Sequence, residues 1–307
     1  MLNFSARSFA INHNQKFNTM KFIRFNYSKP RKHLVSFSTQ VLFMLFLCNT
    51  PAFSQNHTGV VLCKENHQPI AYANIGVIGK GIGTVSDVNG HFKLEIYDLS
   101  NSDTLMLSCI GYLPERITVG DFSSESHHTF FLHQHIIELA EVTVRSASFK
   151  NKNLGNRTQS RSIKAGFKEN QLGYEMGVIM RVRRPVFVEQ VNINIAETSY
   201  DTLFYRLNIY SVAGNNEFSN ILNTPIYIQI PKEQLTESII VDLRDHNLRF
   251  ENDFLVTLEH IKDLGPGYLN FSASFRGRIH HRKTSHANWE STPIGIGINV
   301  DVLEENK

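Results

Sequence analysis

The sequence predicts an all-β protein built from two β-sandwich domains. Apolar and polar residues alternate in many short runs, and Pro, Gly and Asn separate these runs. No stretch shows the sustained apolar periodicity of a long helix. Such alternation is typical of antiparallel sheets that pack face to face. We expect a first sandwich of about seven strands over residues 55–145 and a larger, jelly-roll-like sandwich over residues 169–307.

The N-terminal 54 residues have the composition of a secretory signal peptide. Seven Lys and Arg occur in them, and no acidic residue precedes Glu65. An apolar run from Val41 to Cys48 follows the basic region, and the residues before Gln55 fit cleavage after Ser54. The run is shorter than the roughly 20 residues that a membrane-spanning helix needs. We therefore expect an exported protein of the periplasm or the outer-membrane surface.

The start of the chain and the state of its cysteines stay open at this point. The signal is long when counted from Met1, whereas a start at Met20 gives a more ordinary length. A lipidation motif needs small residues just before its cysteine, but Phe46 and Leu47 precede Cys48. Cys48 therefore does not fit a lipidation site. The remaining cysteines, Cys63 and Cys109, lie in apolar runs and are compatible with a disulfide or with two buried thiols.

The basic character of the whole chain comes from the predicted signal. The chain carries 31 Lys and Arg against 28 Asp and Glu, a net charge of +3. Without the seven basic residues of the signal, 24 basic residues face 28 acidic ones, a net charge of −4. Because nucleic-acid binding needs a basic face on the folded part, we expect no nucleic-acid partner.

The stretch "GIGTVSDVNGHFKLEI" resembles two ligand-binding loops but fits neither. A phosphate-binding loop needs a lysine after its glycines and a following helix, and both are missing here. A calcium loop aligned on Gly90 would place Val85 and Ile96 at positions that need oxygen ligands. We interpret residues 87–90 as a tight hairpin turn, in which Asn89 and Gly90 accept positive φ.

Residues 59–144 resemble the carboxypeptidase-like regulatory domain family, which is widespread in exported Bacteroidetes proteins. The motifs that carry the resemblance are Gly59-Val60-Val61, Pro69, Ala71-Tyr72-Ala73-Asn74, Gly83-Thr84, Asp87, Gly90-His91-Phe92, Ile110-Gly111-Tyr112 and a closing "ELAEVTV". The resemblance implies a transthyretin-like sandwich that is not itself catalytic. Similar domains precede the plug of TonB-dependent receptors, but the rest of this chain is too short for a plug and a barrel. The second block resembles the C-terminal β-domain that follows this module in related proteins.

A polar segment separates the two predicted domains. Residues 146–168 are rich in Asn, Ser and basic residues, and we interpret them as a linker. The strands predicted after it alternate clearly. One of them places Val191, Ile193 and Ile195 on a single face, and the next does so with Leu203, Tyr205, Leu207 and Ile209.

No catalytic, cofactor-binding or metal-binding residues are predicted. His135 and Glu138 have the spacing of a metallocarboxypeptidase ligand pair, but the large catalytic domain that would surround such a pair is missing. An acidic run near Asp245 matches no calcium template. We also find no nucleophile elbow of the Gly-x-Ser-x-Gly type.

Two groups of side chains in the second block are candidates for contact with a partner or ligand. The first group is Arg181, Arg183 and Arg184. Of these, Arg181 and Arg183 are expected on one strand face, where they fit a carboxylate clamp or else ion pairs with acids such as Glu189 or Asp201. The second group lies on a predicted exposed hairpin, which is otherwise interpreted as a solvated loop. Its members are His280, His281, His286 and Trp289.

Together these features predict an exported, non-enzymatic protein of the cell envelope that acts as a binding or structural module. Its expected partner is an unidentified envelope protein or a glycan. Two alternatives are an accessory component of TonB-linked uptake at the outer membrane and a hydrolase with an unrecognised site in the second domain. The sequence does not indicate an oligomeric state.

Overall fold

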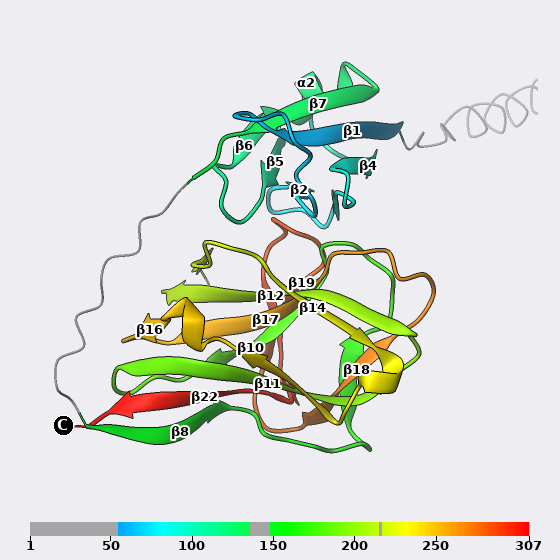
Figure 1. The fold of residues 1–307 in the computed structure, drawn as a ribbon. Coiled ribbons are helices and arrows are strands. Elements are labelled where there is room, and N and C mark those ends of the chain that lie inside the picture. Colours follow the sequence, from blue (N-terminus) through cyan, green and yellow to red (C-terminus); the bar gives the residue numbers. More distant parts are fainter. Residues whose placement is uncertain (1–54, 136–147, 215–216, 307) are drawn as a thin grey trace, which may run out of the picture. The chain divides into compact units, whose positions relative to one another are not determined.

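The computed structural model describes residues 55–135, 148–214 and 217–306, which form two groups of β-sheets (Figure 1). This confirms the predicted all-β fold with two sandwiches. The helical part of the described chain consists of one short α-helix and two single-turn 3₁₀ segments. No helix among these residues has the length and apolar character needed to cross a membrane.

The first domain has the seven strands expected from the sequence. They form a three-stranded sheet in the order β4-β1-β7 and a four-stranded sheet in the order β3-β2-β5-β6. The elements are β1 (Gln55–Cys63), β2 (Asn74–Val77), β3 (Gly83–Val85), β4 (His91–Ile96), β5 (Thr104–Ser108), β6 (Glu115–Thr118), α2 (Val119–Ser123) and β7 (His127–Leu132). Thr118 caps α2, because its hydroxyl accepts a hydrogen bond from the backbone N–H of Asp121.

Alternation along the strands builds the core of this domain. Phe92, Leu94 and Ile96 of β4 are buried, and the residues between them are exposed. Leu105 and Leu107 of β5 fill the same apolar cluster from the other sheet. The period of two therefore places one face of each sheet inside, as the sequence predicts.

The turn at residues 87–90 is confirmed, but it is not a hairpin. The backbone N–H of Gly90 donates to the carbonyl of Asp87, and Gly90 has φ +76°. The Asp87 carboxylate accepts hydrogen bonds from the backbone N–H groups of Asn89 and His91, both 2.8 Å long. Asn89 does not adopt positive φ, contrary to the prediction. The strands on either side, β3 and β4, belong to different sheets, so the turn carries the chain from one sheet to the other.

The second domain consists of a seven-stranded and an eight-stranded sheet. Its strands are β8 (Phe149–Gly155), β9 (Lys164–Phe167), β10 (Glu175–Met180), β11 (Val186–Thr198), β12 (Thr202–Ala213), β13 (Glu217–Asn220), β14 (Ile226–Pro231), β15 (Ser238–Asp242), β16 (Arg249–Phe250), β17 (Phe254–His260), β18 (Leu269–Ser274), β19 (Ile279–Arg282), β20 (Glu290–Thr292), β21 (Gly295–Ile296) and β22 (Ile298–Glu305). The 3₁₀ segments are η1 (Lys232–Gln234) and η2 (Arg244–His246).

One large apolar cluster lies between these two sheets. The main path of the first sheet runs β13-β12-β17-β10-β19-β20, and that of the second runs β21-β18-β11-β22-β8. Val191 and Ile193 of β11 are fully buried against Leu207 and Ile209 of β12 in the same cluster. The faces predicted from alternation are therefore the faces that form the core.

The interpretation of residues 146–168 as a linker is wrong. Residues 149–155 form β8, which pairs with β22 over seven positions, and residues 164–167 form β9, which pairs with β18. The segment looks unstructured because β8 is the edge strand of its sheet, so most of its side chains stay polar. Its backbone hydrogen bonds, rather than an apolar pattern, hold it in the domain.

The two cysteines of the described chain are free thiols. The Cys63 thiol donates to the carboxylate of Glu65 at 3.1 Å. Burial raises the pKa of the Cys109 thiol, so this side chain stays protonated at neutral pH. Of the two alternatives left by the sequence, the structure therefore favours separate thiols.

Candidate functional site

A row of buried charges crosses four neighbouring strands of the seven-stranded sheet. Strand pairing places Arg206 of β12 opposite Glu259 of β17, Glu259 opposite Glu175 of β10, and Glu175 opposite Arg282 of β19. The exposed fraction of the side chain is 1% for Arg206, 0% for both glutamates and 11% for Arg282. Two cations thus flank two anions on the face of the sheet that points away from the apolar core.

Arg206 and Glu259 form the first ion pair of this row. The Nε and Nη2 atoms of Arg206 donate to Oε2 of Glu259 at 3.1 and 2.8 Å. The amide of Asn208 donates to the same oxygen at 2.7 Å, and the Ser285 hydroxyl donates to the other carboxylate oxygen at 3.0 Å. The buried carboxylate therefore has partners on both oxygens, which offsets the cost of removing it from water.

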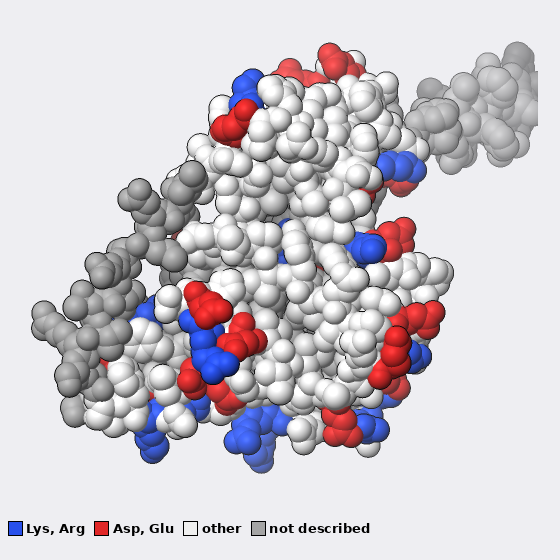
Figure 2. All heavy atoms as spheres, in the orientation of Figure 1, with Lys and Arg blue, Asp and Glu red and all other residues white. Residues whose placement is uncertain are grey.

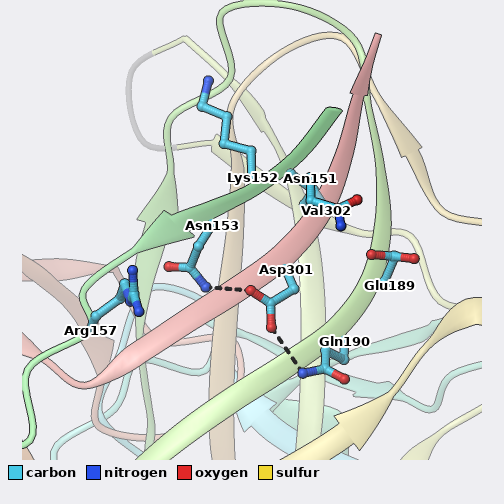
Figure 3. A pocket seen from close by; sticks show the side chains of 8 residues that line it. All are labelled: Asn151, Lys152, Asn153, Arg157, Glu189, Gln190, Asp301 and Val302. Atoms are coloured by element: carbon cyan, nitrogen blue, oxygen red, sulfur yellow. Dashed lines mark hydrogen bonds between the residues drawn. The ribbon is translucent and has the colours of Figure 1, made fainter. Parts of the chain in front are cut away.

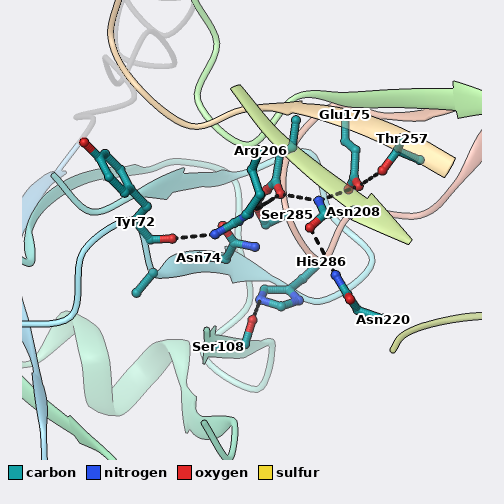
Figure 4. Close-up of polar contacts among 12 residues, drawn as sticks. Tyr72, Asn74, Ser108, Glu175, Arg206, Asn208, Asn220, Thr257, Ser285 and His286 are labelled. Atoms are coloured by element: carbon teal, nitrogen blue, oxygen red, sulfur yellow. Dashed lines mark hydrogen bonds and ion pairs between the residues drawn. The ribbon is translucent and has the colours of Figure 1, made fainter. Parts of the chain in front are cut away.

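Glu175 and Arg282 form the second ion pair. The Nε atom of Arg282 lies 2.8 Å from Oε2 of Glu175, and its Nη2 atom donates to the Tyr210 hydroxyl at 3.0 Å. The other oxygen of Glu175 accepts hydrogen bonds from Asn208, Tyr210 and Thr257. Asn208 donates to both glutamates and so links the two ion pairs into one network. Figure 4 shows its contact with Glu175.

Glu259, Arg206 and Arg282 keep their charges at neutral pH. Burial alone would raise the pKa of Glu259, but Arg206 and Arg282 outweigh it and hold the pKa below its usual range. Burial acts in the opposite direction on the two arginines, and the glutamates raise the pKa of both guanidinium groups above the usual value. Burial and Glu175 raise the pKa of Tyr210, which stays a hydrogen-bond donor. Glu259, Arg206, Arg282 and Tyr210 therefore do not exchange protons near neutral pH.

Arg206 also reaches the first domain. Its Nη1 atom donates to the backbone carbonyl of Tyr72 at 2.8 Å, and its Nη2 atom donates to Oδ1 of Asn74 at 2.6 Å (Figure 4). One guanidinium thus binds Glu259 within the second domain and two oxygens at the start of β2. A planar group with five donors suits such a junction.

The loop after β19 makes a second set of contacts with the first domain. The backbone N–H of Gly79 donates to the carbonyl of His286 at 2.9 Å, and the amide of Asn288 donates to the carbonyl of Gly79 at 3.1 Å. The His286 ring lies 3.2 Å from the Ser108 hydroxyl. A Cβ atom on Gly76 would lie 2.2 Å from the carbonyl oxygen of Ser285. The backbones of β2 and this loop therefore approach too closely for any side chain at residue 76.

Apolar side chains complete the junction. Tyr72 and Val85 of the first domain form a buried cluster with Phe204 and Ile261 of the second. The ring centroids of Tyr72 and Phe204 are 5.2 Å apart, within the range of favourable aromatic pairs. We call the charged row, the loop contacts and this cluster the domain junction.

Arg181, Arg183 and Arg184 are exposed in the turn after β10, so the clamp predicted for Arg181 and Arg183 on a strand is wrong. Arg181 pairs with Asp253, which also accepts a hydrogen bond from the backbone of Val182. The expected acidic partners Glu189 and Asp201 are thus replaced by another acid. Arg183 and Arg184 have no ion pair within the part of the chain that the structure describes.

The predicted hairpin of His280 to Trp289 is not solvent-exposed as a whole. His280 is buried next to the Phe218 ring, and burial lowers its pKa. His281 contacts Thr292 at 3.1 Å. Trp289 packs edge-on against Tyr210, and the Arg282 guanidinium lies 4.6 Å from its ring centre. His286, one of the predicted contact residues, contacts Ser108 and Gly79 in the first domain of the same chain.

The acidic run near Asp245 is held by neighbouring arginines. Asp242 pairs with Arg244, and this contact lowers the pKa of Asp242 to about 2. Arg249 pairs with Glu251 and Glu305. Within residues 55–135, 148–214 and 217–306, no group of three or more His, Cys, Asp or Glu side chains is placed to hold a metal ion. Glu138 of the proposed ligand pair lies outside the described residues.

Arg206, Glu259 and Glu175 were not among the site residues predicted from the sequence. Alternation assigned Arg206 and its neighbour Asn208 to a solvent-facing side of β12, yet both are 1% exposed. A signal was present, because Arg206 and Glu259 each lie in a strand that is rich in apolar residues, and charged residues of these types are rarely buried unless they are paired. Their pairing depends on a strand register that the sequence does not give.

Surface charge is mixed rather than concentrated. On the face shown in Figure 2, Lys and Arg atoms lie interspersed with Asp and Glu atoms, and uncharged atoms cover most of the rest. A basic stripe of the kind that tracks a nucleic-acid backbone is not seen on that face.

The first domain is a β-sandwich module joined to a second sandwich by a buried polar junction. Residues 57–144 match the family model of the CarboxypepD_reg-like domain. The first domain therefore belongs to the carboxypeptidase-like regulatory family, which confirms the resemblance seen in the sequence. No curated protein matches the chain.

Solved structures give only distant similarities. The chain aligns with the VP2 subviral particle of infectious bursal disease virus at 11% identity and a TM-score of 0.17. The alignment covers 83% of this chain and 65% of the viral chain, so this protein spans less than two thirds of that chain's length. It aligns with carbohydrate-binding modules of the β-sandwich superfamily at 10% identity and a TM-score of 0.14, covering 83% and 97%. These TM-scores are too low to relate the folds.

Proposed function

We propose that this protein is an exported, non-enzymatic module of the cell envelope, in which the second sandwich binds an envelope component and the regulatory-like domain is fixed to it as a scaffold. The domain junction is the observation that carries this proposal. Arg206 forms hydrogen bonds with Glu259 of the second domain and with Tyr72 and Asn74 of the first. Glu259 accepts its remaining hydrogen bonds from within the second domain, including one from the Ser285 hydroxyl. Such a network holds two domains in one arrangement and leaves none of these charges available to a substrate.

The export part of the proposal rests on the N-terminal sequence. A basic region, the apolar run ending at Cys48 and small residues before Gln55 support secretion. Mass spectrometry of the protein isolated from the envelope fraction of its native host tests this point. We expect a mature N-terminus at or near Gln55. Protein that keeps Met1 or Met20 and remains in the cytoplasmic fraction would overturn it.

The non-enzymatic part is tested separately with the purified protein. We expect no hydrolysis of peptide, ester or glycoside substrates above a blank without protein. Activity that survives repurification and disappears with a substitution in the second domain would support the hydrolase alternative instead. Genes for a TonB-dependent receptor beside this one, together with copurification of that receptor, would favour a role in uptake.

A further inference from the structure

A connected set of amide and carboxylate side chains covers the outer face of β8, β22 and β11. Strand pairing places Asn153 opposite Asp301, Asp301 opposite Gln190, and Asn299 opposite Asn192. Val300 and Val302, which alternate with them on β22, point into the core. The polar residues therefore share the face of the sheet that is directed away from the apolar cluster.

Asp301 orients the amides around it. Its Oδ1 atom accepts a hydrogen bond from Asn153 at 2.7 Å, and its Oδ2 atom accepts one from Gln190 at 2.9 Å (Figure 3). The Oδ2 atom also accepts a hydrogen bond from Asn192 at 2.9 Å. Partial burial alone would raise the pKa of Asp301, but these hydrogen bonds outweigh it and keep the pKa below its usual range. The carboxylate thus stays ionised, and the NH₂ group of each amide is turned toward it.

This orientation leaves acceptor oxygens without a donor. The Oδ1 atom of Asn153 is shielded from solvent and has no hydrogen-bond partner among the described residues. No hydrogen bond within the described chain reaches Oε1 of Gln190 either. A ligand O–H group can therefore donate to the Gln190 oxygen, which meets no donor within the described chain.

These groups line a cavity of about 420 Å³. Lys152, Arg157, Glu189 and Asp301 are the charged residues that line it (Figure 3). Two basic and two acidic side chains give the lining no net charge. The balance favours a neutral polar ligand over a polyanion or a polycation.

An apolar cavity of about 290 Å³ adjoins the polar one and shares Glu189 with it. Phe149 of β8 and Phe187 of β11 line it, with ring centroids 5.6 Å apart, and Leu303 of β22 lies between these strands. Leu303 is two residues after Asp301, so the aromatic and polar patches belong to the same face of one sheet. Both cavities are of the size that small ligands occupy, or slightly below it.

Sugars have the chemistry that these two patches match. Each hydroxyl group both donates and accepts hydrogen bonds, as the amides and carboxylate of the polar patch require. The C–H faces of a sugar ring are apolar and pack against aromatic rings. We propose that the outer face of β8, β22 and β11 binds a neutral saccharide, with Gln190 and Arg157 as polar contacts and Phe149 and Phe187 as the apolar surface. This assignment rests on the proposed binding function and gives its ligand class.

The test is binding of the purified full chain to an array of neutral oligosaccharides of glucose, galactose, mannose and xylose, with heparin as the anionic probe. Hits are measured by titration calorimetry. We expect at least one neutral series to bind, and binding to be insensitive to salt. Gln190→Ala should weaken it about five- to tenfold, the equivalent of one hydrogen bond. Gln229→Ala, which changes an exposed glutamine on β14, should leave affinity unchanged.

Arg157→Ala serves as a second site variant, because its side chain is exposed and its loss should not disturb folding. It should weaken the same ligand. Salt-sensitive binding of heparin alone, equal affinities for all three variants, or no binding of any neutral series would each overturn the saccharide site. A chain found in the envelope with its N-terminus near Gln55 but with no saccharide binding would refute this inference and leave the proposed export intact.

Discussion

Arg206 and Glu259 form an ion pair 2.8 Å long in which the side chains are 1% and 0% exposed, and the same guanidinium donates to Tyr72 and Asn74 of the other domain. Taking two charges out of water is costly, and the gain from pairing them depends on every remaining donor and acceptor being satisfied. Here the hydrogen bonds that satisfy Arg206 come from the first domain. The ion pair is therefore fully compensated only when the two domains are in contact.

Replacing Arg206 with Met should destabilise the protein strongly. The variant keeps most of the side-chain volume but leaves Glu259 without its nearest buried cation, and breaking a buried pair typically costs about 3–5 kcal/mol. Urea denaturation measures the loss. Adding Glu259→Gln to the same chain should recover part of it, because the unpaired charge is removed.

Arg244→Met is the matched control for this experiment. Arg244 pairs with Asp242 on the surface, where both side chains are more than half exposed. The urea midpoint of this variant should match that of the parent chain, because surface pairs add little to stability. Equal losses for Arg206→Met and Arg244→Met would contradict the role given to the junction.

Gly76→Ala should open the contact between β2 and the loop after β19. The added methyl group would lie 2.2 Å from the carbonyl oxygen of Ser285, so one of the two backbones must move. Trp289, the one tryptophan of the chain, lies in this loop and reports the change through its fluorescence. We expect a red-shifted emission and a loss of more than about 1 kcal/mol in unfolding free energy.

Gly214→Ala provides the comparison, because a methyl group there meets no atom within 4 Å. It should leave Trp289 emission and stability close to those of the parent. A normal emission spectrum in Gly76→Ala would show that the loop does not pack on β2 as described.

The protein should lose stability as the pH falls below about 6.5. Burial lowers the pKa of His286 to about 3, with Arg282 adding to the effect, so this side chain stays neutral in the folded state. In the unfolded chain the same ring takes up a proton near pH 6.5, so the unfolded state binds more protons between pH 6.5 and 3 and stability falls with pH in that window. The slope from one such group approaches about 1.4 kcal/mol per pH unit.

His286→Asn should reduce this slope while keeping the backbone conformation, because Asn tolerates the φ of +68° found at this position. Unfolding free energies from urea titrations at pH 7 and pH 4.5 give the comparison. His260, His280 and His128 also have lowered pKa values, so part of the pH dependence should remain. Identical slopes in the two proteins would rule out His286 as a contributor.

Gly90→Val should destabilise the first domain by more than about 1 kcal/mol. Gly90 has φ +76°, which a β-branched residue resists, and a Cβ atom would lie 2.6 Å from the carbonyl oxygen of Val61. Asp87→Ala should cost less, since it removes two side-chain hydrogen bonds of an exposed turn. Thermal denaturation with and without calcium tests both points. A calcium-dependent rise in melting temperature that Asp87→Ala abolishes would replace the turn by a metal site.

The sequence by itself determined the all-β class, the first domain and the faces that form the core. Strand alternation is a local property, so Phe92, Leu94, Val191 and Ile193 could be assigned to the interior without knowing which strands pair. The turn at Gly90 was predictable for the same reason, because the backbone conformation of a few consecutive residues selects glycine. The family motifs added the identity of the first domain.

Only the tertiary structure decided which polar residues are buried. Arg206, Glu259, Glu175 and Arg282 come from four strands, and the register between strands sets them in one row. The first domain then covers the side of β12 that alternation alone assigns to solvent. Residues 149–155 were misjudged as a linker for a related reason, since an edge strand is held by backbone hydrogen bonds that leave no apolar pattern. Which strands pair, and which sheet face another domain covers, depend on contacts between residues far apart in the sequence. A pattern of neighbouring residues does not encode such contacts.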